Sequence, residues 1–278
     1  MLLATLLALG AAVLHAGWNL VAKRADGDRY MVLWAQFFVG GLIALPFMIG
    51  NQLLFGLAWQ GYVWGALSAC THLPYTWLLA RAYTVGDFSV SYPVARGGGA
   101  ALAAAGGVLI LGDHLSALEM MGIAIVVMGL TLLAYRSTAA NLAMAMGVAV
   151  TIGTYTLLDA KGARVTASVA YIFVTFVGTA FTNTVFGLIT GRRRAMASML
   201  RISWRRASIT GLASLVTYGL VLVAVQHAPV GYVTALRESS VVLAALAGWK
   251  LLGEGDHRRR LTAAFVVFCG LMVLVAGG

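Results

Sequence analysis

Long apolar runs follow one another along the whole chain, with only short polar loops between them. About 20 apolar residues make an α-helix long enough to cross the hydrocarbon core of a bilayer. Because lipid offers no hydrogen-bond partner to a backbone, such runs fold as membrane-spanning helices. The sequence therefore predicts an all-α membrane protein. We expect ten transmembrane helices, at roughly residues 2–22, 30–50, 59–80, 88–111, 116–135, 139–159, 167–190, 207–227, 230–252 and 261–277.

Composition agrees with this prediction, since 61% of the residues are hydrophobic and only 10% are charged. A soluble domain is about half apolar and about a quarter charged. The net charge of +10 can suggest a nucleic-acid partner, but the basic residues lie in the short loops between apolar runs. That placement is typical of cytoplasmic loops, so we expect a lipid bilayer as partner and no nucleic acid. No basic residue precedes Lys23 and no small-residue cleavage site follows the first run, which we expect to be a retained span.

The second half of the chain repeats the first. Arg96 and the triplet Leu111, Gly112, Asp113 match Arg237 and the triplet Leu252, Gly253, Glu254, each at an offset of 141 residues (237 minus 96). We expect two five-helix repeats, residues 1–135 and 139–278, which together form one transport domain. Because five is an odd number of crossings, the repeats would enter the membrane from opposite faces, as inverted repeats of secondary transporters do. Within the first repeat, Ser116 and Glu119 have the spacing of a capping box, which predicts the start of its fifth helix.

Loop charge predicts the orientation. Of the basic residues outside the spans, only Lys161 and Arg164 lie in even-numbered loops; the others lie in odd-numbered loops. The stretch from Gly191 to Arg206 alone carries six arginines, and we expect it to lie along a lipid surface. The positive-inside rule then places the odd loops in the cytoplasm and both termini outside. We expect a multi-pass protein of the inner or plasma membrane.

Two arginines, Arg96 and Arg237, lie well inside apolar spans, at matching places in the two halves. An arginine at the centre of a span costs about 2.5–3.5 kcal/mol on insertion scales, so it has to face a partner, a wet cavity or a ligand. A guanidinium is a planar fork suited to carboxylate, phosphate or phosphonate. We predict a shared cavity between them that binds an anionic or zwitterionic solute. The alternative is that each arginine satisfies backbone carbonyls, or that Arg237 pairs with Glu238.

Glu238 is interpreted as the only carboxylate deep in any span. Three roles are open: it can balance an arginine, bind the amino group of a zwitterion, or carry a coupling proton. Charge balance is the favoured interpretation. In the first repeat Gly97 occupies the matching place, so any such role is asymmetric.

Further candidate binding residues share helix faces with these groups. His15, Trp18 and Asn19 lie on one face of the first span, and Tyr155 matches Trp18 in the second repeat. His15 can relay a proton or donate one structural hydrogen bond, and both alternatives stay open. Tyr92 precedes Arg96 by one turn and shares its face.

Three other aromatic side chains are weaker candidates. We expect His72 to serve in packing, and Tyr218 and Tyr232 to anchor the ends of spans.

The sequence has no Gly-rich phosphate loop, no metalloprotease motif and no recognisable Ser/His/Asp arrangement, and neither Cys70 nor Cys269 has metal-ligand spacing. We therefore expect no enzyme activity, no catalytic residue, no metal and no cofactor. Transport without an ATP site would run on a gradient.

The matched triplets Leu111-Gly112-Asp113 and Leu252-Gly253-Glu254 end the fourth span of each five-helix repeat. With these triplets and ten predicted spans, the chain resembles EamA-type members of the drug/metabolite transporter superfamily. More narrowly, His15-Ala-Gly-Trp18-Asn19 and Tyr92-Pro93-Val94-Ala95-Arg96 are similar to the branch described as phosphonate-utilisation-associated membrane proteins. The resemblance implies alternating access, with spans one to four and six to nine around the cavity and spans five and ten peripheral. It also implies cytoplasmic termini, the opposite of the orientation that loop charge predicts.

The function predicted from the sequence is secondary, gradient-driven transport of a small anionic or zwitterionic metabolite, such as an amino acid or aminophosphonate. Two alternatives stay open: a lipid-headgroup flippase, and a non-transporting membrane sensor or partner subunit. A small-molecule solute is the expected ligand, and a homodimer is an open option.

Overall fold

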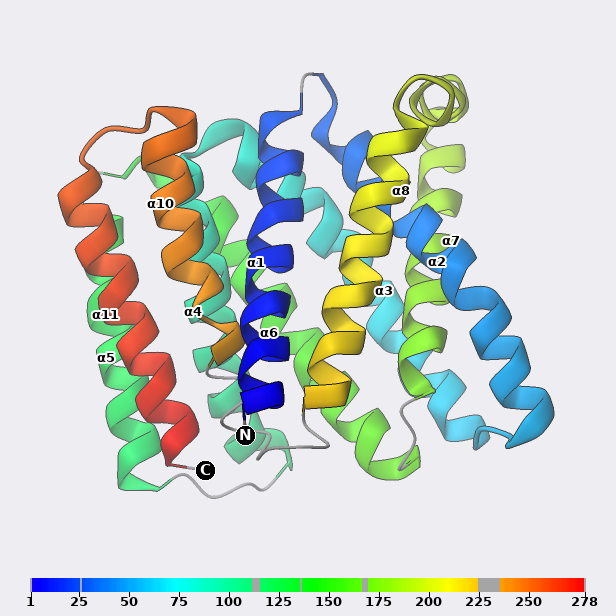
Figure 1. The fold of residues 1–278 in the computed structure, drawn as a ribbon, viewed down its shortest axis with the longest axis horizontal. Helices are drawn as coiled ribbons and strands as arrows, with labels where there is room; N and C mark the ends of the chain where they lie inside the picture. The colour runs from blue at the N-terminus through cyan, green and yellow to red at the C-terminus, as the bar shows by residue number, and fades with distance from the viewer. Residues whose placement is uncertain are drawn as a thin grey trace.

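In the computed structural model the described residues are 2–25, 27–111, 116–135, 137–166, 170–224 and 236–277, and every element within these ranges is helical (Figure 1). The first half contains α1 (Leu2–Arg24), α2 (Arg29–Leu54), α3 (Trp59–Val85), α4 (Phe88–Gly106), the short π-helix η1 (Gly107–Leu111) and α5 (Ala117–Ala134). The second half contains α6 (Ala139–Thr166), α7 (Tyr171–Ile189), α8 (Arg193–Ala224), α10 (Ser240–Leu252) and α11 (His257–Ala276). The predicted all-α fold is confirmed. So is the capping box: the Ser116 side chain accepts from the Glu119 backbone, and Glu119 reaches back to Ser116.

Five of the described helices are long and apolar enough to cross a membrane by length and composition: α1, α2, α5, α7 and the Ala139–Asp159 part of α6. The other predicted spans coincide with α3, α4, α8, α10 and α11, which are shorter, less apolar or more charged. The helix α6 runs seven residues beyond the predicted end at residue 159, and therefore contains Lys161 and Arg164, which the sequence placed in a loop.

The arginine-rich start of α8 lies crosswise to the bundle, so that Figure 1 shows it end-on at the top of the molecule. The helix bends at Ser203, whose φ of −117° and ψ of 19° are not helical. The part that follows runs alongside α1 and α2. The sequence predicts that this crosswise segment lies along a lipid surface, and that placement stays a prediction.

Helix packing is nearly symmetric between the two halves. The helix α2 packs against α7, α4 against α10 and α5 against α11, while α3 packs against α6 and α7 as α8 packs against α1 and α2. Exchanging the halves maps the first three pairs onto themselves, and it exchanges the two pairs that α3 makes with the two that α8 makes. Both termini lie at one end of the bundle (Figure 1), as an even number of crossings requires. The pattern supports two repeats, whose bounds stay a prediction.

The pair α5–α11 shows how closely helices approach in this bundle. A Cβ added to Gly270 would lie 2.6 Å from the backbone nitrogen of Val126 and 2.9 Å from the carbonyl oxygen of Gly122. Small residues that allow such close backbone approach are typical of helix interfaces in membranes.

Replacing Gly270 with leucine is therefore expected to lower the free energy of unfolding by about 1–3 kcal/mol, the usual cost of overpacking. Gly17, on an exposed face of α1 with nothing within 4 Å of an added Cβ, offers the matched control Gly17→Leu. Thermal unfolding in detergent measures both variants. Equal melting temperatures for the two would contradict the close contact between α5 and α11.

Candidate functional site

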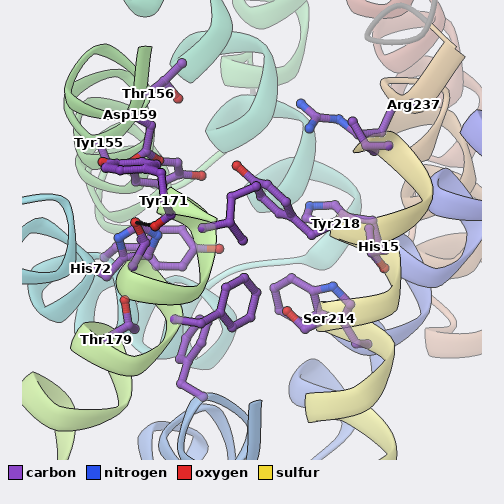
Figure 2. Close-up of a pocket in the computed structure, with 18 of the residues that line it drawn as sticks. His15, His72, Tyr155, Thr156, Asp159, Tyr171, Thr179, Ser214, Tyr218 and Arg237 are labelled. Carbon is purple, nitrogen blue, oxygen red and sulfur yellow. Dashed lines mark hydrogen bonds between the residues drawn. The ribbon is translucent and has the colours of Figure 1, made fainter. Parts of the chain in front are cut away.

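A cavity of about 220 Å³ lies inside the bundle, between the two halves of the chain (Figure 2). Residues of α1, α2, α3 and α4 line it from one half, and residues of α6, α7 and α8 together with Arg237 line it from the other. Five of the predicted site residues meet in its wall: His15, Trp18, Arg96, Tyr155 and Arg237.

The other three predicted residues lie behind this wall. Asn19 is 2% exposed, donates to the carbonyl oxygen of His15 at 2.8 Å and accepts from the Tyr83 hydroxyl at 2.6 Å. Tyr92 is buried, and its ring centroid lies 6.0 Å from that of His15. Both residues therefore lie next to His15 and are not among the residues that line the cavity.

Glu238, the third, joins the two arginines. Its Oε1 atom accepts from Nη2 of Arg96 and, at 3.0 Å, from Nη2 of Arg237. The Glu238 side chain is 4% exposed, against 11% for Arg96 and 27% for Arg237. One carboxylate thus serves two guanidinium groups, which matches the charge-balance interpretation of Glu238. The local pair between Arg237 and Glu238 also exists, yet Arg237 still lines the cavity.

Among the residues that the structure describes, this arrangement leaves one positive charge without a counter-charge on the side of the cavity where Arg96 and Arg237 lie. Among the described residues, the Nε atoms of Arg96 and Arg237 and the Oε2 atom of Glu238 have no hydrogen-bond partner. Unpaired charge that is sheltered from water is costly, so an anion that enters the cavity gains a strong partner.

A second carboxylate inside a helix of the bundle, the half-buried Asp159, corrects the interpretation of Glu238 as the only one. The predicted sixth span ended at this residue, but α6 continues to Thr166 and places Asp159 about two turns inside the helix. Asp159 lines the cavity and its Oδ1 accepts from the Tyr171 hydroxyl at 2.8 Å. The sequence signal was present, since Tyr155 and Asp159 are four residues apart and share a helix face.

Two aromatic residues that the sequence marked as weaker candidates, His72 and Tyr218, also line the cavity. The ring of His72 stacks on that of Tyr155 at 4.4 Å, and its Nδ1 lies 2.8 Å from the carbonyl oxygen of Ser68. Tyr218 of α8 lines the cavity as well, in addition to the span-end role predicted for it, which stays a prediction. Tyr232 lies outside the described residues. The described residues contain no group of three or more metal-ligating side chains that could hold an ion.

Polar contacts tie the helices together at the end opposite the termini. Glu254 accepts from the backbone nitrogens of Phe88 and Ser89, at 2.5 and 2.9 Å, and Arg260 pairs with Asp87 at 2.6 Å. Lys23 donates to the carbonyl oxygen of Tyr83 at 2.9 Å and also to that of Gly86. These contacts join the ends of α1, α3, α4, α10 and α11. Asp113, the counterpart of Glu254, lies outside the described residues.

Comparison with known proteins agrees with this architecture. Residues 140–276 match the model of the EamA-like transporter family. The chain is an EamA-type protein. It is thus a multi-pass membrane transporter of the drug/metabolite transporter superfamily. The match does not extend to the phosphonate-associated branch, which stays a prediction.

Other comparisons inform the fold alone. A solved structure described as "Crystal structure of protein" has a TM-score of 0.60 and 16% sequence identity to the EamA-type protein. The match covers 97% of this chain and 95% of that one. No curated protein matches the chain. At this identity the similarity concerns the fold and assigns no solute.

Proposed function

We propose that the protein carries a small anionic or zwitterionic metabolite across the membrane by gradient-driven alternating access. The observation that supports this is the pair of guanidinium groups, one from each half, which share a cavity and only one carboxylate. Residues 1–135 and 139–278 would be the two repeats that rock about this site, as in other transporters built from inverted repeats.

The size of the cavity favours a small solute. Its volume of about 220 Å³ lies below the range of about 300–1,000 Å³ that is usual for pockets of drug-sized ligands. Its walls combine aromatic rings with a few polar groups, the usual make-up of a selective small-molecule site. An amino acid or an aminophosphonate is the kind of metabolite that suits this site.

Alternating access is supported by the difference between the two ends of the bundle. The contacts of Glu254, Arg260 and Lys23 join the helices at one end. Many lining residues, Tyr171, Tyr218 and Arg237 among them, come from helix ends nearer the termini. Since the basic loops lie at the joined end, the positive-inside rule makes that end cytoplasmic and the termini external. The cavity would then face the outside in this structure.

Replacing Glu254 with glutamine is expected to shift the protein toward the opposite state, because the amide loses the charge that Arg260 and two backbone donors share. Charge-assisted hydrogen bonds contribute about 1.5–3 kcal/mol each, so the loss of one changes the ratio of the two states by about tenfold or more. A cysteine at Ser214 in the cavity wall, in a background without Cys70 and Cys269, reports access. In Glu254→Gln, a thiol reagent added on the side of the termini should label this cysteine more slowly than it does in the protein that keeps Glu254.

Glu119→Gln is the matched control, because this carboxylate belongs to the capping box of α5 and lies away from the joined ends. Unchanged labelling in Glu254→Gln, or an equal change in both variants, would contradict a role for Glu254 in closing this end.

Flux across a sealed bilayer tests the proposed function directly. Purified protein in liposomes is given radiolabelled amino acids, aminophosphonates, simple carboxylates and amines, with and without a proton or sodium gradient. Gradient-dependent accumulation of an acid or zwitterion is the expected result. Tight binding without flux would identify a sensor, and transbilayer movement of labelled lipid without solute flux would identify a flippase.

A further inference from the structure

The cavity has a negative end as well as a positive end. Figure 2 shows Asp159 and Tyr155 on one side of the cavity and Arg237 on the other. The inference drawn from this separation rests on the proposed function, and it narrows the solute from anionic or zwitterionic to zwitterionic.

In the part of the chain that the structure describes, Asp159 has no ion-pair partner. The Tyr171 hydroxyl, at 2.8 Å from Oδ1, is a neutral partner. A sheltered carboxylate with only neutral partners is costly to keep, and a positively charged ligand group would offset that cost.

Glu238 is not available to bind a positively charged group of the ligand. Both guanidinium groups already share its Oε1 atom, and its side chain is buried behind the cavity wall. The acidic group that remains to meet an incoming cation is therefore Asp159.

Aromatic rings surround this acidic end. Tyr155 is four residues before Asp159 on α6, its ring is stacked on His72, and Tyr75 meets it edge-on at 5.7 Å. Faces of tyrosine rings attract ammonium groups by cation–π interaction, by about 0.5–2 kcal/mol.

We propose that Asp159 binds the ammonium group of a zwitterionic solute whose acid group is held by Arg237 and Arg96. The two arginines and Glu238 sum to one positive charge, and Asp159 adds one negative charge at the other side. A simple anion would leave Asp159 without a cation, and a simple amine would leave the arginines without an anion. A molecule that carries both groups satisfies both ends.

Asp159→Asn tests the proposal, because the amide keeps the shape and the acceptor for Tyr171 but removes the charge. The ligands are matched triplets: an α-amino acid, the acid that lacks its amine, and the amine that lacks its acid. The wild-type protein should bind the amino acid most tightly, measured by the ligand-induced shift in melting temperature and by uptake into liposomes. In Asp159→Asn the affinity for the amino acid should fall at least about tenfold while that for the simple acid stays or rises.

Glu119→Gln is the matched control, since it also changes a carboxylate to an amide, but in the capping box of α5 and not in the cavity wall, and it should keep the preference for the amino acid. Comparison of melting temperatures without ligand shows whether each variant is folded. If Asp159→Asn binds the amino acid as tightly as the wild type, the proposal for Asp159 is wrong. The proposed transport of a solute whose acid group binds the arginines is not affected by that result. If the wild-type protein transports simple acids as efficiently as amino acids, the proposal for Asp159 is likewise wrong. If it transports neither, the proposed function is wrong too.

Discussion

Replacing Arg237 with glutamine is expected to weaken the binding of an acid or zwitterion by at least about 30-fold. Arg237 carries the positive charge that the pair between Arg96 and Glu238 leaves unbalanced, and it lines the cavity. Truncating one partner of a buried, hydrogen-bonded charge pair costs about 2–5 kcal/mol, which is a factor of about 30 or more in Kd. The fold should tolerate this change, since Arg96 and Glu238 remain paired.

Arg201→Gln is the matched control, because it removes the same charge from the exposed start of α8, which precedes the bend at Ser203 and does not line the cavity. Solute-dependent shifts in melting temperature and initial rates of uptake should fall in Arg237→Gln and stay unchanged in Arg201→Gln. Arg237→Lys should recover part of the affinity, since it keeps the charge but not the planar fork. A folded double variant, Arg96→Ala with Arg237→Ala, that still carries its solute at the normal rate would show that the site is elsewhere.

The sequence predicted the helical scaffold well, because apolar runs of about 20 residues have few alternatives in a bilayer. It also selected Arg96 and Arg237, since arginines inside apolar runs are costly wherever the chain goes. Both of these arguments use only the composition of a stretch of about 20 consecutive residues, and neither needs to know which helices pack together.

The site residues and contacts that the sequence did not predict depend on how far each helix extends and on which helices pack together. Asp159 was taken as the end of a span because a length of about 20 residues was assumed, whereas α6 is 28 residues long. His72 and Tyr218 looked like packing and anchoring residues, because nothing local shows that α3 and α8 both face the cavity. The bond from Arg96 to Glu238 joins residues 142 positions apart, and no local pattern predicts such a contact.

Replacing Glu238 with alanine is expected to lower the free energy of unfolding by about 3–5 kcal/mol, the cost of removing one partner from a buried ion pair. Two guanidinium groups would then lie close together in a sheltered site without a carboxylate. Both would have to find water or another acceptor, and both would repel each other. Chemical unfolding of the purified protein in detergent measures this loss.

The control that separates lost packing from unpaired charge is the double variant Arg96→Met with Glu238→Met. It removes the pair between Arg96 and Glu238, and it leaves one guanidinium group, that of Arg237, without this carboxylate, where Glu238→Ala leaves two. Replacement of a buried ion pair by apolar side chains of similar volume is often neutral or stabilising. The double variant should therefore be more stable than Glu238→Ala, although it changes two residues. If instead the losses in Arg96→Met, Glu238→Met and the double variant simply add, the two side chains do not interact, and the link between the halves of the chain is not made by this carboxylate.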